Sequence, residues 1–127
     1  MLAIKRDFID AYINLGELYI RRALYEQALD TYQTALQKAE YLSDAKTADL
    51  HYNIAVAKSL MVENSKMTLA TKHQTLNEIA QSLMQAIQAD SEHKEAMINL
   101  AILLQNVSTT GLRDAASPLI SSLAVAV

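Results

Sequence analysis

Apolar side chains recur near the start of this chain at helical intervals of three and four residues. One helix face carries Tyr12, Leu15 and Tyr19, and a second carries Ala28, Tyr32 and Ala35. Gly16 and Ala28 are small, so two helices can cross closely here while aromatic rings fill the space beside the crossing. The pattern therefore predicts that residues 9–42 form two helices packed as a hairpin.

The same stretch resembles the tetratricopeptide repeat, a helical hairpin of ~34 residues. In that motif W-x2-L-G-x2-Y on the first helix precedes A-x3-F on the second. Tyr12 stands at the Trp position, Gly16 at the glycine and Tyr32 at the Phe, whereas Glu40 replaces the final proline. Residues 9–42 are therefore interpreted as repeat one; two unrelated amphipathic helices are the alternative.

Repeat two is predicted for about residues 45–91, with an insertion between its helices. The motif positions hold His51, Ile54, Ala55 and Lys58 on the first helix, then Ile79, Leu83 and Ala86 on the second. The connection is expected at Glu63–Thr68, where Asn64 or Ser65 ends one helix and Ser65 or Thr68 caps the next. Both helices are expected to be longer than usual, because helix formers flank the break.

Repeat three is predicted for about residues 94–126. Its motif positions hold Met97, Leu100, Ala101 and Leu104, then Ala116, Ile120 and Leu123. The segment Ser108–Gly111 is expected to be the loop between these helices. Pro118 is tolerated only in a first turn, so the last helix is expected to begin near Ser117 or to kink there.

These patterns predict an all-α fold. Residues 1–127 are expected to form one right-handed superhelical array of antiparallel hairpins, with about three tetratricopeptide-like repeats and six helices. The composition agrees, because 51% of the residues are apolar and the chain has only two glycines and one proline, too few turn residues for a β-rich domain. No apolar run approaches the ~20 residues of a membrane-spanning helix.

Both ends of the chain suggest a piece of a longer array. Met1–Phe8 falls where a preceding repeat would end, and Leu119–Val127 is apolar without the polar face that caps such arrays. The alternative is that a partner chain, or a homo-oligomer, covers the apolar C-terminal end.

In tetratricopeptide arrays the first helix of each repeat lines a concave groove. The resemblance implies twelve partner-binding positions: Asn14, Glu17, Arg21, Asp49, Tyr52, Asn53, Val56, Glu95, Ile98, Asn99, Ile102 and Asn106. Asparagine recurs at one repeat position, as in the asparagine ladder of the O-linked N-acetylglucosamine transferase. Such amides both donate and accept, so a ladder can hold an extended peptide backbone. Alternatively, these amides tie neighbouring helices together.

Acidic residues at groove positions of the first helices favour a basic or neutral ligand. They are Asp10, Glu17, Asp49 and Glu95, which could instead be ordinary carboxylates near helix starts. Repeat proteins that grip the acidic tails of chaperones use a two-carboxylate clamp of Lys, Arg and Asn. The corresponding positions hold Ile13, Glu17, Asn53, Glu95 and Asn99, so a carboxylate ligand would be repelled.

The sequence offers no sign of an enzyme. The chain has no cysteine, and its three histidines lack metal-ligand spacing. There is no phosphate-binding glycine loop and no G-x-S-x-G motif. The net charge of −3 gives no support for nucleic-acid binding. We therefore expect no catalytic residue, metal or cofactor in this chain, and a protein or peptide partner.

A narrower resemblance is to the transmembrane-and-tetratricopeptide protein O-mannosyltransferases. The stretches that carry it are Arg6–Phe8, Ala11–Ile13, Gly16–Leu18, Ala48–Leu50, Tyr52–Asn53, His93–Lys94, Ala101–Ile102 and Leu112–Arg113. Arg6 replaces an expected proline, and the membrane half of these proteins is absent. The resemblance implies a repeat region in the lumen of the endoplasmic reticulum that holds substrate rather than transferring sugar.

Three functions remain open at this point. The leading one is a protein-interaction scaffold from a larger repeat protein, which would place the chain in the cytoplasm. The second is the substrate-recruiting lumenal region of an O-mannosyltransferase. The third is a structural or self-assembly spacer.

Overall fold

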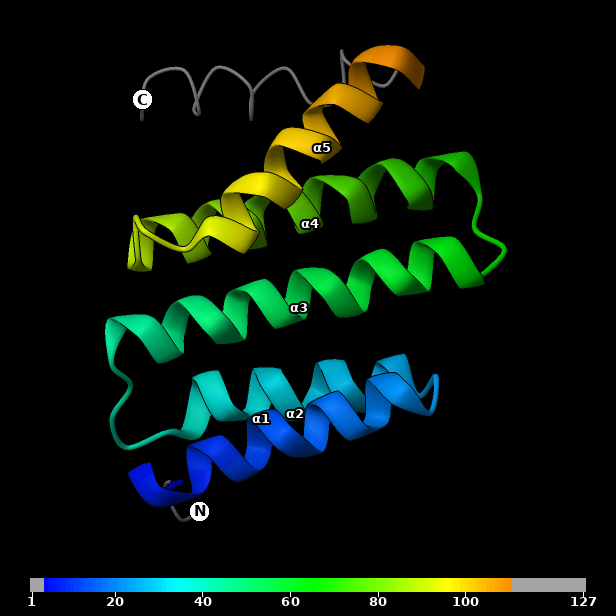
Figure 1. Ribbon diagram of the computed structural model, residues 1–127. Coiled ribbons are helices and arrows are strands. Elements are labelled where there is room, and N and C mark those ends of the chain that lie inside the picture. Colours follow the sequence, from blue (N-terminus) through cyan, green and yellow to red (C-terminus); the bar gives the residue numbers. More distant parts are fainter. Residues whose placement is uncertain (1–3, 111–127) are drawn as a thin grey trace.

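The structure, a computed structural model, describes residues 4–110 (Figure 1). It contains five helices, each running back across the one before it: α1 (Arg6–Arg21), α2 (Tyr25–Lys38), α3 (Asp44–Asn64), α4 (Leu69–Ala89) and α5 (Lys94–Thr110). The all-α prediction is confirmed for this part of the chain. The predicted sixth helix, with Pro118 and the apolar Leu119–Val127, lies outside the described residues, and the right-handed superhelix stays a prediction.

One predicted loop is wrong. Ser108, Thr109 and Thr110, assigned to a loop, belong to α5, which ends at Thr110. The preceding turns of α5 are apolar, and most helical stability comes from the packing of such turns. The helix can therefore include Ser108, Thr109 and Thr110 despite their weak helix propensity. At the other end, α1 begins at Arg6, so Phe8 lies in the first helix, whereas the division of the chain into repeats stays a prediction.

The first hairpin is held by a close crossing of α1 and α2. Tyr32 of α2 is 1% exposed, and Ala28 and Ala35 are fully buried on the same face. The Tyr32 ring lies against the backbone of α1 at Gly16, where an added Cβ would come within 2.9 Å of three ring atoms. Burial, together with the nearby negative charge of Glu17, raises the pKa of Tyr32 to about 12. The ring therefore stays neutral in the core.

The turn between α1 and α2 is made without glycine. Ala23 adopts a φ of 59°, in the left-handed region. Its N–H bonds the carbonyl of Ile20 at 3.0 Å, and the N–H of Leu24 bonds that of Tyr19 at 2.9 Å. These two bonds are the Schellman arrangement, which satisfies carbonyls at the end of a helix. An alanine in this conformation is strained, because its Cβ crowds the following carbonyl.

A short clasp closes the far end of the same hairpin. The N–H of Ile4 donates to the carbonyl of Lys38 at 2.7 Å, and the N–H of Glu40 donates to the carbonyl of Ile4 at 2.8 Å. Ile4 and Ala39 thereby form an isolated β-bridge. The chain entering α1 is tied directly to the chain leaving α2.

The second hairpin is built from two helices of 21 residues, as the insertion predicted. Helix α3 ends at Asn64, and Thr68 caps α4 by accepting the N–H of Thr71 at 3.2 Å, both as expected. Ser43 caps α3 in the same way through Lys46. A core of small and large apolar residues joins α3, α4 and α5: Ala48, Ala55, Ile79, Ala80, Leu83, Ala86, Ala96 and Leu100.

Replacing Gly16 with alanine is expected to lower the free energy of unfolding by ~1–3 kcal/mol, because the new methyl group overlaps the buried ring of Tyr32. In an ordinary helix the same change would raise stability by ~1 kcal/mol. Urea unfolding followed by circular dichroism measures the difference, and an increase in stability would contradict the close crossing.

Ala23→Gly is the matched control, since it is the opposite exchange only seven residues away. Glycine tolerates the left-handed conformation, so this variant should gain up to ~1 kcal/mol. A gain for Gly16→Ala together with a loss for Ala23→Gly would mean that general helix propensity, not local geometry, decides the outcome.

Burial lowers the pKa of His51 on α3 below its usual value. Below about pH 6.5 the unfolded chain takes up a proton that folded His51 resists, so acid stabilises the unfolded state. The contribution of neutral His51 to stability is fully present above its pKa in the unfolded chain. It falls as the pH drops toward the pKa of His51 in the folded protein. Urea unfolding between pH 7.5 and 5 should therefore show that the free energy of unfolding falls less steeply with acid for His51→Gln than for the parent protein. Parallel pH profiles would contradict this assignment.

Candidate functional site

Helices α1, α3 and α5 share one face of the molecule, and this face carries two adjoining hollows. The smaller, of about 260 Å³, is lined by Ile13, Glu17, Asp49, Tyr52, Asn53, His93 and Glu95. We call it the acidic hollow because it receives a carboxylate from each of the three helices. Tyr52 also lines the second hollow, so the two meet at one aromatic side chain.

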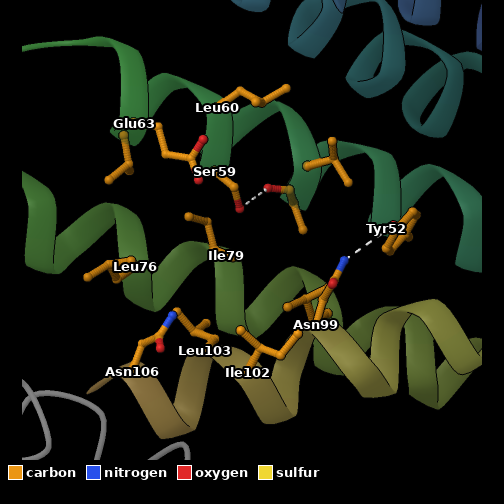
Figure 2. Close-up of a pocket in the computed structure, with 14 residues that line it drawn as sticks. Tyr52, Ser59, Leu60, Glu63, Leu76, Ile79, Asn99, Ile102, Leu103 and Asn106 are labelled. Atoms are coloured by element: carbon orange, nitrogen blue, oxygen red, sulfur yellow. Dashed lines mark hydrogen bonds between the residues drawn. The ribbon is translucent and has the colours of Figure 1, made fainter. Parts of the chain in front are cut away.

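The second hollow, of about 440 Å³, is mostly apolar and lies where α5 diverges from α3 (Figures 1 and 2). Figure 2 shows side chains of α3 along one side and of α5 along the other, with Leu76 and Ile79 of α4 between them. Its walls include Val56, Leu60, Leu83, Ile102 and Leu103, and Glu63 and Asn106 add polar groups. We call this the apolar hollow. Its size falls within the ~300–1,000 Å³ of typical ligand sites.

Most of the residues predicted for the groove line these hollows. Nine of the twelve do so: Glu17, Asp49, Tyr52, Asn53 and Glu95 in the acidic hollow, and Val56, Asn99, Ile102 and Asn106 with Tyr52 in the apolar one. Asn14, Arg21 and Ile98 are exposed and line neither. Whether any of these residues binds a partner stays a prediction.

The three repeated asparagines have different surroundings. Asn99 donates through Nδ2 to the Tyr52 hydroxyl at 3.2 Å, which ties α5 to α3. Asn53 is half-buried beside the acidic hollow, and Asn14 is exposed on α1. One member of the proposed ladder therefore holds neighbouring helices together, one lines the acidic hollow, and one is exposed on α1.

His93 is the residue of this face that sequence reasoning missed. It precedes α5 and is buried, and its Nδ1 accepts the N–H of Ala96 at 3.2 Å. Because an accepting nitrogen carries no proton, the proton resides on Nε2, which donates to Oδ1 of Asp49 at 3.0 Å. The imidazole thus caps α5 and anchors it to α3. Histidine is not among the preferred N-caps, so only its place before a helix could have drawn attention to it.

The His93 ring also supports the side chain that separates the hollows. Its centroid lies 5.1 Å from that of Tyr52, with the two planes tilted by 42°. Tyr52 is therefore held by His93 on its ring and by Asn99 at its hydroxyl. Such double support fixes the orientation of this aromatic wall.

The carboxylates of the acidic hollow remain accessible to solvent. Side chains of Asp49 and Glu95 are 48% and 67% exposed. Asp10, which the sequence grouped with them, instead pairs with Lys46 of α3 outside this hollow. Among the described residues, no three or more His, Asp and Glu side chains form a group that could hold a metal ion. The described helices also include none long and apolar enough to cross a membrane.

Comparison with known proteins gives one distant similarity. No protein-family model and no solved structure matches the chain. Over 115 residues, which are 91% of this chain, the sequence is 27% identical to the human protein O-mannosyl-transferase TMTC3. The chain spans only 11% of the length of that protein. The similarity agrees with the resemblance to O-mannosyltransferases, and it leaves membership of the tetratricopeptide family a prediction.

The capping role of His93 can be tested by substitution. His93→Ala should lower the free energy of unfolding by ~1–3 kcal/mol, because it removes a helix cap and a buried hydrogen bond. His93→Asn should recover part of this loss, since asparagine is a strong N-cap. Thermal and urea unfolding measure both variants. If asparagine were no better than alanine, the cap would not be the source of the stability.

Proposed function

We propose that this chain is a protein-interaction scaffold of the tetratricopeptide type that binds a peptide or protein segment along the face of α1, α3 and α5. The observation that supports the proposal most is that the two hollows adjoin and share Tyr52 as a common wall. Adjoining hollows, one polar and one apolar, suit an extended segment better than a small compact molecule.

Two further features support a binding role. Ile98 and Ile102 are 58% and 50% exposed on α5, next to half-buried Asn99. Ile102 lines the apolar hollow, and Ile98 lies one helical turn away outside it. Exposed large apolar side chains close together mark contact surfaces more often than isolated ones do. Tyr52 is held from two sides, and a rigid aromatic anchor is a common centre of binding energy. These features favour binding over a spacer role, which requires no prepared face.

A second candidate function is that of a lumenal region in an O-mannosyltransferase. The identity of 27% with TMTC3 supports it. In that case the same face would hold a protein substrate in the endoplasmic reticulum, and transfer of mannose would occur elsewhere in the larger protein. Apolar spans of ~20 residues in a longer form of the protein would favour this candidate over a cytoplasmic scaffold.

The test of a binding role is selection from a random peptide library displayed on phage. Peptides selected on the parent protein are then measured by fluorescence anisotropy on Asn53→Ala/Asn99→Ala. We expect the double variant to bind about tenfold more weakly, because it removes polar groups from both hollows. Failure to select any peptide, or equal affinity for the double variant, would favour the spacer.

A matched control removes amides elsewhere. Gln33→Ala/Gln37→Ala changes two exposed positions on α2, away from both hollows. It should bind selected peptides like the parent protein. Circular dichroism of all variants checks that loss of the Asn99–Tyr52 bond leaves the helices folded. A loss of affinity in the Gln33/Gln37 control would place the binding surface outside the face of α1, α3 and α5.

A further inference from the structure

We infer that the preferred ligand is an extended segment in which Arg or Lys is followed two residues later by a large apolar residue. This inference rests on the proposed binding function and names its ligand class. The cationic side chain would occupy the acidic hollow and the apolar side chain the apolar hollow, on either side of Tyr52.

The charge of the acidic hollow is not balanced from within. Glu17, Asp49 and Glu95 come from three different helices, and its lining includes no Lys or Arg. Its one histidine, His93, hydrogen-bonds Asp49 through Nε2 and has Nδ1 3.6 Å from Oε2 of Glu95, so three carboxylates face a single imidazole. By contrast, the carboxylate of Asp10 is already paired with Lys46. An incoming cation would therefore be attracted to the acidic hollow.

The apolar hollow supplies the second half of the specificity. Val56, Leu60, Ile102 and Leu103 offer apolar surface, and Ile102 is half-exposed without a ligand. Burying such surface against an apolar side chain is favourable by roughly 25 cal/mol per Å². A charged side chain there would lose its hydration among aliphatic walls. The two hollows thus accept different chemistries.

The spacing of the two ligand residues follows from the shared wall. Tyr52 lines both hollows, so the two side chains must enter on the same face of the ligand and close together. In an extended chain, residues i and i+2 point the same way and lie ~6.6–6.8 Å apart. A cation that enters beside Tyr52 would also lie close to its aromatic ring. Cations bind favourably over the face of such a ring.

The experiment uses fluorescein-labelled peptides of twelve residues in a Ser/Gly background, each with one test motif. We expect Arg-x-Leu to bind about tenfold more tightly than Glu-x-Leu, citrulline-x-Leu or Arg-x-Ser in anisotropy titrations at low salt. Glu17→Gln/Glu95→Gln should weaken Arg-x-Leu by a similar factor and leave citrulline-x-Leu unchanged. Ile102→Ser should weaken Arg-x-Leu and citrulline-x-Leu alike.

The matched control removes the same charge elsewhere. Glu26→Gln/Glu40→Gln alters two exposed carboxylates that line neither hollow, and it should leave the affinity for Arg-x-Leu unchanged. If both double variants weakened the binding of Arg-x-Leu equally, the preference for Arg would be an effect of net charge alone. That result would overturn the inference.

Other outcomes separate this inference from the proposed function. If Leu peptides bind regardless of the Arg, the scaffold role stands and the cationic preference is wrong. If no peptide binds here and none is selected from the library, the scaffold role itself fails. Displacement of Arg-x-Leu by a peptide of residues 111–127 would show that a segment of this chain competes for the hollows. That result would overturn the inference that the ligand is an external partner.

Discussion

The size of the side chains at helix crossings is the constraint on which this structure depends. Within residues 4–110, half of the buried apolar core is alanine, so neighbouring helices approach closely along their length. The largest fully buried side chains are Tyr32, Leu50 and Leu83, which fill the spaces between these close contacts. Gly16 is the extreme case, because the ring of Tyr32 occupies the place of its missing Cβ. Enlarging a small residue at such a crossing would separate two helices rather than disturb one contact.

The same constraint explains what the sequence could predict. Helical periodicity and the small residues Gly16 and Ala28 located the first hairpin, and Thr68 was recognisable as the cap of α4 because hydroxyl side chains favour that position. The end of α5 was not predictable, since Ser108 and Thr109 have the composition of a loop. Their helical state depends on the helix that precedes them, and no local propensity encodes it.

The face shared by α1, α3 and α5 was predictable only in outline. Repeat positions brought Tyr52, Asn53 and Glu95 to one face, because equivalent positions on successive first helices align. The separation into an acidic and an apolar hollow was not visible, since it depends on how far α5 diverges from α3. His93 was missed because its role depends on Asp49, which is distant in sequence and close only after folding. Long-range pairs of this kind leave no periodic signal.

The clasp at Ile4 has a mechanical consequence for the first hairpin. Its two hydrogen bonds join the entrance of α1 to the exit of α2, while the turn at Ala23 joins the opposite ends. Residues 4–40 therefore form a closed loop in which neither helix has an independent free end. Fraying of one terminus must strain the other, so the hairpin should open as a single unit, and tension applied across it would load both clasp bonds before either helix unwinds.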